Sequence, residues 1–469
     1  MDMITFKDVS FRYRGSKRKE ALSGLNFHIN KGETVLFCGG SGCGKSTITR
    51  IMNGLIPHFY KGDLTGTVTI DGEDLKGKTL YEINRNTGSV FQNPRTQFFN
   101  LDTDAELVFG GENRGMELEE IEENRDRAVT RFQMEDLLHR NIMELSGGQQ
   151  QRVACASIYC TDPEIYVLDE PTSNLDEASI EALRETLEKL KAEGKTIIVA
   201  EHRLYFLKNL ADRIFYLKNG RLEEVYTAEE FQKLSQDAIH AMGLRSLDQP
   251  KREPLGEKQG KTDGELTVKN LSVRYTDRVK GTKKEINLGN IRIPYGEVVA
   301  VIGKNGIGKS TFSRALAGLQ KGCRAEILKE GKVFGKKDRI KNCYLVMQDV
   351  NHQLFCESVE KEITLGSRER DEARLAELLK RLDLQDLKDT HPMDLSGGQK
   401  QRVAIGAALY SGKRILILDE PTSGLDYGQM IRVAEALKEA KKDVDVILLI
   451  THDVELMNAC CTAVLDLRK

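Results

Sequence analysis

The chain has 469 residues, which is enough for two or three domains that each bury a hydrophobic core. Charged residues make up 30% of the chain, but the formal net charge is only −2, which argues against a general attraction to nucleic acid. The mean hydropathy of −0.43 and the lack of a long apolar run predict no membrane-spanning helix. The nine cysteines form no C-x-x-C pair, so we expect a reduced, cytosolic environment and no zinc site.

The first predicted elements are short strands at residues 3–6 and 9–13, followed by a continuous apolar strand at 34–38. Directly after that strand, residues 39–47 match the pattern G-x-x-x-x-G-K-[ST]. In this pattern the glycines let backbone N–H groups surround a phosphate, the lysine reaches the terminal phosphates, and the hydroxyl suits Mg²⁺. The helix that follows points its positive end at the anion. The sequence therefore predicts a nucleotide-phosphate site.

Residues 145–149, which read Leu-Ser-Gly-Gly-Gln, predict the start of a helix. Ser146 and Gln149 fit a capping box, and capping alone would explain these two residues. Two consecutive glycines are costly in a first helical turn unless something approaches the backbone closely, and a γ-phosphate is one candidate.

A second apolar strand, 165–168, ends at the carboxylates of Asp169 and Glu170, and a third, 196–200, is followed closely by His202. Continuous apolar runs that alternate with helices are typical of parallel strands covered on both faces. In such sheets ligands bind beyond the carboxyl ends of the strands, where these polar side chains fall.

The same motifs recur in the second half of the chain, including a second phosphate loop at 303–311. The second half lacks residues after its phosphate loop and again after its glutamine, whereas its last part keeps its spacing. A repeat of this length is a whole domain. The offsets are 264 for Lys45 and Lys309, 256 for Gln92 and Gln348, and 250 both for Ser146 and Ser396 and for His202 and His452.

Between the two halves, residues 227–242 predict a helix, and the polar segment 245–264 is typical of a linker. We therefore predict a first domain at 1–225, a helix and linker at 226–264, and a second domain at 265–469.

The carboxylates at the strand ends suit nucleotide hydrolysis, which needs a metal ion and an oriented water molecule beside the phosphates. Asp169 and Asp419 are placed for the Mg²⁺ side, and Glu170 and Glu420 are placed to polarise the attacking water. An Asp-Glu pair at a strand end is often only a helix cap, but the phosphate loops upstream favour the catalytic interpretation.

The order phosphate loop, Gln, Leu-Ser-Gly-Gly-Gln, Leu-Asp-Glu-Pro, Ser-x-Leu-Asp, His resembles the nucleotide-binding domain of ABC ATPases, twice, over nearly the whole chain. The resemblance implies an α/β fold of two tandem P-loop ABC ATPase domains, each with a mainly parallel sheet core, an antiparallel β subdomain and a helical subdomain. It implies ATP and Mg²⁺ as cofactors. It also implies an intramolecular pseudo-dimer in which each nucleotide lies between one half's phosphate loop and the other half's Ser-Gly-Gly motif.

The resemblance assigns site residues to both halves and implies two competent hydrolytic sites. Tyr13 and Tyr275 resemble the aromatic residue that stacks on adenine, although each could equally be a core residue of its strand. The catalytic groups implied are Glu170, Glu420, His202 and His452. The residues implied to bind Mg²⁺ are Ser46, Gln92, Asp169, Ser310, Gln348 and Asp419. The ATP-binding residues are Tyr13, Gly39, Gly40, Ser41, Gly42, Cys43, Gly44, Lys45, Ser46, Thr47, Gln92, Ser146, Gly148, Tyr275, Gly303, Lys304, Asn305, Gly306, Ile307, Gly308, Lys309, Ser310, Thr311, Gln348, Ser396 and Gly398.

Among ABC ATPases, the segments 53–66, 92–98 and 106–113 are similar to the ATPase subunits of energy-coupling factor (ECF) importers for vitamins or metal ions. Two alternatives remain. Fused sugar-importer ATPases usually have a degraded second site, whereas loop 303–311 and Glu420 are intact here. Ribosome-associated ABC ATPases typically join their domains by a long charged helix, and this linker is short.

The ECF resemblance implies partners and a location. The partners are transmembrane importer subunits and a separate substrate-binding membrane protein, with no nucleic acid, and the location is the cytoplasmic face of the cell membrane, peripherally bound. By the same resemblance, Gln97 and Phe98 line a groove for helices of a transmembrane subunit. The alternative is an ordinary loop whose aromatic residues pack inward. The corresponding segment 348–355 has no proline, so we expect a second groove of different shape.

Overall fold

The computed structural model describes residues 2–15, 20–173, 175, 177–253, 264–276, 283–303, 307–367 and 370–467, without the side chains of 274–276, 283 and 284. Lys304, Asn305 and Gly306 of the second predicted phosphate loop, and the side chain of Tyr275, lie outside the described residues. The chain divides into two compact units, Met1–Gln249 and Pro250–Lys469.

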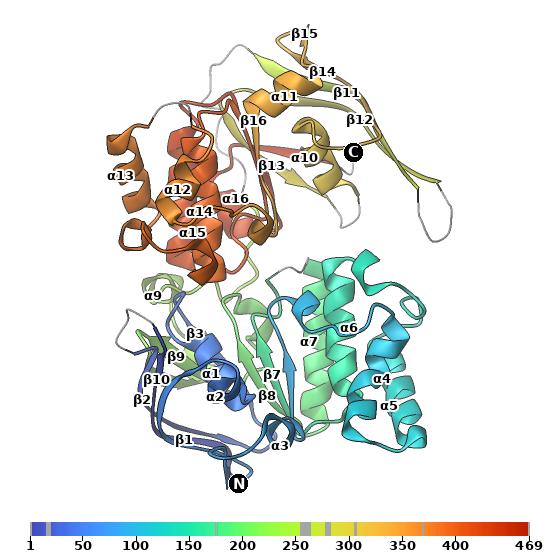
Figure 1. The fold of residues 1–469 in the computed structure, drawn as a ribbon, viewed down its shortest axis with the longest axis vertical. Helices are drawn as coiled ribbons and strands as arrows, with labels where there is room; N and C mark the ends of the chain where they lie inside the picture. Colours follow the sequence, from blue (N-terminus) through green and yellow to red (C-terminus); the bar gives the residue numbers. More distant parts are fainter. Residues whose placement is uncertain are drawn as a thin grey trace. The chain divides into compact units, whose positions relative to one another are not determined.

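Unit 1 contains two β-sheets (Figure 1). The smaller one is antiparallel in its pairings and has the order β2 (Leu22–Asn30), β1 (Asp2–Tyr13), β4 (Gly62–Ile70), β5 (Glu73–Asp74). The larger one has the order β10 (Arg221–Thr227), β9 (Arg213–Lys218), β3 (Thr34–Gly39), β8 (Thr196–Ala200), β7 (Ile165–Asp169), β6 (Thr87–Val90). All its pairings are parallel except that of β10 with β9.

In unit 1, one group of helices forms a layer of its own and helix α1 packs on the parallel sheet. Helices α4, α5 and α6 contact one another and form a helical layer, drawn with α7 to the right of β7 and β8 in Figure 1. Helix α1 follows β3 and contacts β3, β7 and β8. The bounds are α1 (Lys45–Met52), α2 (Leu55–His58), α3 (Leu80–Asn84), η1 (Pro94–Thr96), α4 (Thr103–Arg114), α5 (Leu118–Arg131), η2 (Ile142–Glu144), α6 (Gly147–Tyr159), α7 (Glu177–Ala192), η3 (Tyr205–Leu207), α8 (Ala228–Gln232) and α9 (Gln236–Ala241).

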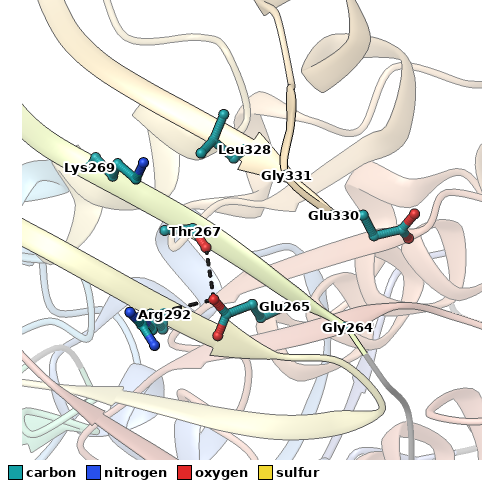
Figure 2. A pocket seen from close by; sticks show the side chains of 8 residues that line it. All are labelled: Gly264, Glu265, Thr267, Lys269, Arg292, Leu328, Glu330 and Gly331. Carbon is teal, nitrogen blue, oxygen red and sulfur yellow. Dashed lines mark hydrogen bonds and ion pairs between the residues drawn. The ribbon is translucent and has the colours of Figure 1, made fainter.

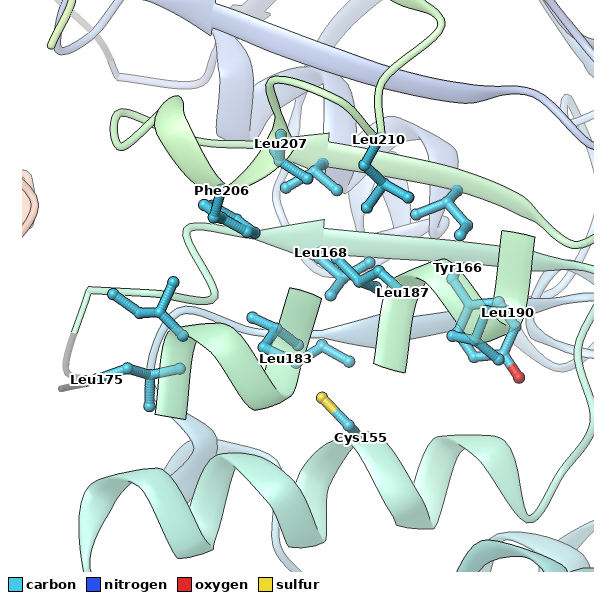
Figure 3. Close-up of a cluster of buried hydrophobic side chains, with 14 of the residues drawn as sticks. Cys155, Tyr166, Leu168, Leu175, Leu183, Leu187, Leu190, Phe206, Leu207 and Leu210 are labelled. Atoms are coloured by element: carbon cyan, nitrogen blue, oxygen red, sulfur yellow. The ribbon is translucent and has the colours of Figure 1, made fainter. Parts of the chain in front are cut away.

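The central strands bury both faces, which is why their sequences are continuously apolar. Along β7, Tyr166 and Leu168 join one hydrophobic cluster, while Ile165 and Val167 join the other. Figure 3 shows Tyr166 and Leu168 beside leucines of α7, such as Leu187, in the first cluster. Because side chains alternate across a strand, each central strand contributes to the hydrophobic clusters on both faces of the sheet. Each fully buried aliphatic side chain stabilises the fold by about 1.5–3 kcal/mol.

The segment after β10 belongs to the core of unit 1. The sequence predicts one helix over 227–242, whereas the structure has two short helices, because the Ser235 side chain accepts a hydrogen bond from Ala238 N and starts a new one. Phe231, Ile239 and Leu244 from this segment are buried in the same cluster as α7.

Unit 2 repeats this architecture. Its antiparallel sheet has the order β12 (Lys283–Pro294), β11 (Glu265–Thr276), β14 (Cys323–Lys329), β15 (Lys332–Val333), and its parallel sheet has the order β16 (Cys343–Val346), β17 (Ile415–Asp419), β18 (Val446–Ile450), β13 (Glu297–Ile302), β19 (Ala463–Asp466). Its helices are α10 (Lys309–Leu316), α11 (Lys336–Asn342), η4 (Val350–His352), α12 (Val359–Thr364), α13 (Glu372–Arg381), η5 (Gln385–Leu387), η6 (Pro392–Asp394), α14 (Gly397–Tyr410), α15 (Tyr427–Ala440) and α16 (Val454–Cys460).

The α/β fold with tandem P-loop units is confirmed, and the structure shows where the two halves differ in length. Unit 1 inserts α2 after its phosphate-loop helix, whereas unit 2 runs from α10 to β14 with no helix between them. The helical layer also differs, since α4 has 12 residues and its counterpart α12 has 6.

Within the described residues, none of the helices combines the length and apolar character needed to cross a lipid bilayer.

Candidate active site

The phosphate loop of unit 1 connects β3 to α1 and closely approaches its neighbours. Gly39 has φ +148° and Gly44 has φ +112°. A Cβ atom on Gly39 would lie 2.2 Å from the carbonyl oxygen of Leu217, and one on Gly44 would lie 2.5 Å from Leu22 Cδ2. Only glycine fits both the backbone conformation and the space, so this tight loop depends on glycine at both positions.

Lys45 extends back over this loop. Its side chain is buried, and its Nζ atom donates hydrogen bonds to the carbonyl oxygens of Gly39 at 2.9 Å and Gly40 at 3.4 Å. In unit 2, Lys309 Nζ donates to Gly303 O at 2.8 Å, and Gly308 has φ +111°. Both ammonium groups therefore lie at the phosphate loops.

A hydroxyl and a carboxylate meet next to each lysine. Ser46 Oγ donates a hydrogen bond to Asp169 Oδ1 at 3.0 Å. Burial and the neighbouring charge of Glu170 raise the pKa of Asp169, and burial likewise raises the pKa of Asp419 against the opposing effect of its hydrogen bond from Ser310.

The donor set around each loop fits Mg²⁺. No group of three or more His, Cys, Asp or Glu side chains in the described part of the chain forms a metal cage. Mg²⁺ is commonly held by one or two carboxylate or hydroxyl oxygens together with nucleotide phosphates and water, which is the kind of donor set that Ser46 and Asp169 present. When bound, the ion would neutralise phosphate charge.

Glu170 lies where the sequence predicts a base. Its backbone has φ +46°, an uncommon conformation for a non-glycine residue, and its N–H donates to Ala200 O at 2.8 Å. Gln92 Nε2 donates to Glu170 Oε2 at 2.7 Å, and His202 Nε2 lies 3.3 Å from Oε1. Burial alone would raise the pKa of Glu170, but the interactions with His202 and the charge of Lys45 together outweigh it and lower that pKa.

The counterpart Glu420 has the same backbone but a different neighbour. It has φ +48°, and its N–H donates to Ile450 O at 2.8 Å. Thr451 Oγ1 donates to Glu420 Oε2 at 3.1 Å, and residue 201 of unit 1, which occupies the corresponding position, is a glutamate. His452 follows β18 as predicted, and Gln348 is exposed after β16.

The Leu-Ser-Gly-Gly-Gln segments begin α6 and α14 through the predicted capping boxes. Ser146 N donates to Gln149 Oε1 at 2.9 Å, and the Ser396 box has the same geometry. A Cβ atom on Gly148 would lie 2.3 Å from Ser179 Oγ, and one on Gly398 would lie 2.9 Å from Leu425 Cδ2. The second glycine of each motif therefore has a packing role inside its own unit, in addition to the nucleotide contact that the resemblance implies.

Tyr13 ends β1, and its side chain lies beside the first turns of α1. Its hydroxyl is 3.1 Å from Thr47 Oγ1 and accepts a hydrogen bond from Arg50 Nη1 at 3.0 Å. The Arg50 guanidinium lies 4.2 Å from the ring centre of Tyr60. The sequence analysis did not identify Arg50 and Tyr60 as neighbours of Tyr13. The only available signal was their position after the phosphate loop.

A surface pocket elsewhere in unit 2 carries none of this chemistry. Figure 2 shows it on β11, β12 and β14, with Glu265 accepting from Thr267 at 3.1 Å and lying 3.9 Å from the exposed Arg292. No predicted nucleotide-binding residue lines it.

The fold and the two phosphate loops define a P-loop ATPase with tandem nucleotide-binding units. The family model described as ABC transporter matches residues 22–173 and 286–423. The chain therefore belongs to the ABC transporter family, and it binds and hydrolyses ATP with Mg²⁺.

Known proteins of this family resemble the chain over almost its full length. A relative from Treponema denticola named "Putative ABC transporter ATP-binding protein" is 41% identical, over 99% of this chain and 95% of the relative. The archaeal ribosome recycling factor aABCE1, solved in complex with the ribosomal stalk protein aP1, is 26% identical with a TM-score of 0.61, over 98% of this chain and 87% of that one. A model of ribosome-bound archaeal Pelota and ABCE1 has a TM-score of 0.68 at 24% identity, over 97% and 76% of the two chains, and shows the fold alone.

Proposed function

We propose that this chain is the ATP-hydrolysing motor subunit of an ABC-type membrane importer, of the ECF kind that serves vitamins or metal ions. It would bind transmembrane subunits from the cytoplasmic face of the cell membrane, while a separate membrane protein captures the solute. The proposal rests on membership of the ABC transporter family and on one feature found in both units.

That feature is an exposed aromatic side chain on a loop whose backbone is hydrogen-bonded to a buried glutamate. Phe99 is 78% exposed and Phe355 is 76% exposed. The loop that carries Phe99 is held by the buried Glu106, whose Oε2 accepts hydrogen bonds from Phe99 N at 3.1 Å and Asn100 N at 2.8 Å. Large apolar side chains held rigidly in water are typical anchors for a partner's apolar surface.

Unit 2 has the same arrangement of a buried glutamate and an exposed aromatic residue. Glu362 Oε2 accepts from both Phe355 N and Cys356 N at 2.7 Å, and Glu362 is buried. Each unit also exposes a methionine in the short helix before its Leu-Ser-Gly-Gly-Gln segment, with Met143 44% exposed in unit 1 and Met393 54% exposed in unit 2. An amphipathic helix of a transmembrane subunit is a partner that such surfaces fit.

The two aromatic residues beside the proposed groove differ in exposure. Phe98 is only partly exposed and packs against the hydrophobic core, whereas Phe99 beside it presents an exposed aromatic surface. Gln97 supports the loop by accepting a hydrogen bond from Phe91 N at 3.2 Å. Gln353 accepts from Met347 N at 2.7 Å in the same way, so this loop has the same internal support without the proline.

For the motor cycle, we propose that each nucleotide is held between the phosphate loop of one unit and the Ser-Gly-Gly motif of the other, in an intramolecular pseudo-dimer. Lys45 and Lys309 would hold the terminal phosphates, and Glu170 and Glu420 would polarise the attacking water. ATP would favour the closed pair because its γ-phosphate contacts both units, and hydrolysis would reopen it and move the attached membrane subunits.

Co-purification from solubilised membranes tests the partner. The wild-type chain, co-expressed with the membrane proteins encoded beside it, should be recovered in complex with a polytopic membrane protein. Phe99→Ala combined with Phe355→Ala should reduce that recovery by about tenfold or more, because hot-spot aromatic residues typically contribute about 2 kcal/mol or more. Phe59→Ala is the matched control, since Phe59 is 71% exposed on unit 1 but lies outside both loops.

A second function is a ribosome-associated ABC ATPase, favoured by the 26% identity to the archaeal ribosome recycling factor over 98% of this chain. Sedimentation of the chain with ribosomes at moderate salt, and not with membranes, would support this alternative and overturn the importer proposal. For a fused sugar-importer ATPase, the expected result is recovery with sugar-importer membrane subunits instead.

A further inference from the structure

The two units attach the loop after the candidate base in different ways. In unit 1, Glu201 is 2% exposed and lies between the end of β8 and His202. In unit 2 the corresponding residue is Thr451, and a carboxylate appears two positions later, at Asp453. Arg203 takes the place of Asp453 in unit 1. The acidic group has therefore changed sides of the histidine between the units.

In unit 1 both oxygens of Glu201 are used, and each oxygen holds a different loop. Oε2 accepts hydrogen bonds from Thr172 N at 3.2 Å and Thr172 Oγ1 at 2.9 Å, and Thr172 lies two residues after Glu170. Oε1 accepts from His202 N at 2.8 Å and Arg203 N at 3.2 Å. One buried carboxylate thus connects the loop that carries the candidate base to the backbone that carries the histidine.

Unit 2 divides the same tasks between two side chains. Thr422 Oγ1, the counterpart of Thr172, donates to Asp453 Oδ2 at 2.6 Å, and Asp453 Oδ1 caps α16 by accepting from Leu456 N at 3.1 Å. Thr451 is left to donate directly to Glu420, and it also accepts from Asp453 N at 3.0 Å.

The exchange changes what touches the base. A glutamate at position 201 has no hydroxyl to offer Glu170, and its carboxylate is engaged by four N–H and O–H donors on the two loops. Glu170 is instead held by Gln92 and lies beside His202. A buried, multiply hydrogen-bonded carboxylate is rigid, and removing its acceptor oxygens leaves buried donors without partners.

We propose that Glu201 is a positioning residue of unit 1, which holds Glu170 and His202 in a fixed relation, and that Thr451 and Asp453 share this task in unit 2. The two ATPase sites then hydrolyse ATP with bases that are supported differently. This inference rests on the proposed role of Glu170 as the base.

Glu201→Gln in the otherwise unchanged chain tests the role, because the amide keeps the size of the side chain but offers one acceptor oxygen in place of two. The expected result is a fall in kcat of about twofold or more, with KM for ATP within about twofold of wild type. Glu82→Gln is the matched control: Glu82 is an exposed capping-box residue of α3, and its exchange should leave kcat unchanged.

A double exchange at positions 201 and 203 distinguishes a positioning role of Glu201 from a general structural role. Glu201→Thr should lower kcat, and Glu201→Thr combined with Arg203→Asp, which copies the arrangement of unit 2, should recover it. Unchanged kcat in Glu201→Gln overturns the proposal. So does a failure of the combined exchange to recover activity in a chain that binds ATP and unfolds at the wild-type temperature. Glu170→Gln is measured alongside, because unchanged turnover there rejects the assignment of the base and not merely the role of Glu201.

Discussion

Lys45 and His202 meet beside the phosphate loop of unit 1, where Nζ and Nε2 lie 3.2 Å apart. They are separated by 157 positions along the chain, and parallel pairing of β3 with β8 brings them together. The imidazole nitrogen also lies 3.3 Å from Glu170, so the phosphate-loop lysine, the histidine predicted to contact the γ-phosphate and the candidate base form one series of contacts.

The lysine of this series should be required for nucleotide binding. Lys45→Ala is expected to weaken ATP binding to unit 1 by about tenfold or more, since a charged hydrogen-bonding group to phosphate is worth roughly 1.5–3 kcal/mol. Binding of a fluorescent ATP analogue measures this. Lys76→Ala, on an exposed turn, is the control. Wild-type affinity at both sites of Lys45→Ala would contradict the placement of the phosphates.

Each candidate base should be needed for turnover and dispensable for binding. Glu170→Gln and Glu420→Gln, made singly, are each expected to reduce ATP turnover, because the amide cannot accept a proton from water. Phosphate release gives the rate, and ATP binding should remain within about threefold of wild type. If one of the two exchanges leaves turnover unchanged, that unit is not hydrolytic.

The close approach of Gly39 to β9 predicts a stability effect. Gly39→Ala places a Cβ atom 2.2 Å from Leu217 O and should destabilise unit 1 by about 1–3 kcal/mol or more, through both the steric clash and the positive φ. Gly72→Ala is the matched control, because Gly72 has φ +78° but no atom within 4 Å of an added Cβ. Urea unfolding should show a larger loss for Gly39→Ala, and equal losses would argue against a steric clash with Leu217.

A carboxylate of unit 2 predicts a pH-dependent contribution to stability. Asp445 is hydrogen-bonded to Lys329 Nζ at 2.6 Å and to Arg414, and its side chain is 11% exposed. Burial alone would raise the pKa of Asp445, but the hydrogen bonds from Lys329 and Arg414 outweigh it and lower that pKa. A lowered pKa means that the stabilisation is present above the unfolded-state pKa, near about 4, and is lost as the pH falls through the folded-state value.

Asp445→Asn should therefore destabilise unit 2 at pH 7, by about 1–3 kcal/mol, and the difference from wild type should shrink as the pH falls below about 4. Urea unfolding at several pH values measures both effects. Asp63→Asn is the control, because the ion pair of Asp63 with Arg12 is exposed and such pairs contribute only about 0–1 kcal/mol. A difference that persists unchanged at low pH would show that the charge of Asp445 is not responsible.

The sequence by itself determined the features that depend on local chemistry. The pattern of 39–47 predicts a phosphate loop because glycine, lysine and serine act there through their own backbone and side chains. The capping boxes at Ser146 and Ser396 are equally local, and both are formed. Continuous apolar strands predict a sheet covered on both faces, because a strand with two buried faces needs two apolar sets of side chains.

Only the tertiary structure decided which groups, far apart in sequence, support one another. Nothing local distinguishes Phe98 from Phe99, but in the folded unit Phe98 packs against the core whereas Phe99, whose N–H donates to Glu106, is exposed. Likewise, Glu201 reads as an ordinary residue before a histidine until its contact with Thr172, 29 positions away, is seen. Such contacts come from how the strands are ordered in the sheet, and that order is set by packing of the whole unit rather than by any short stretch of the chain.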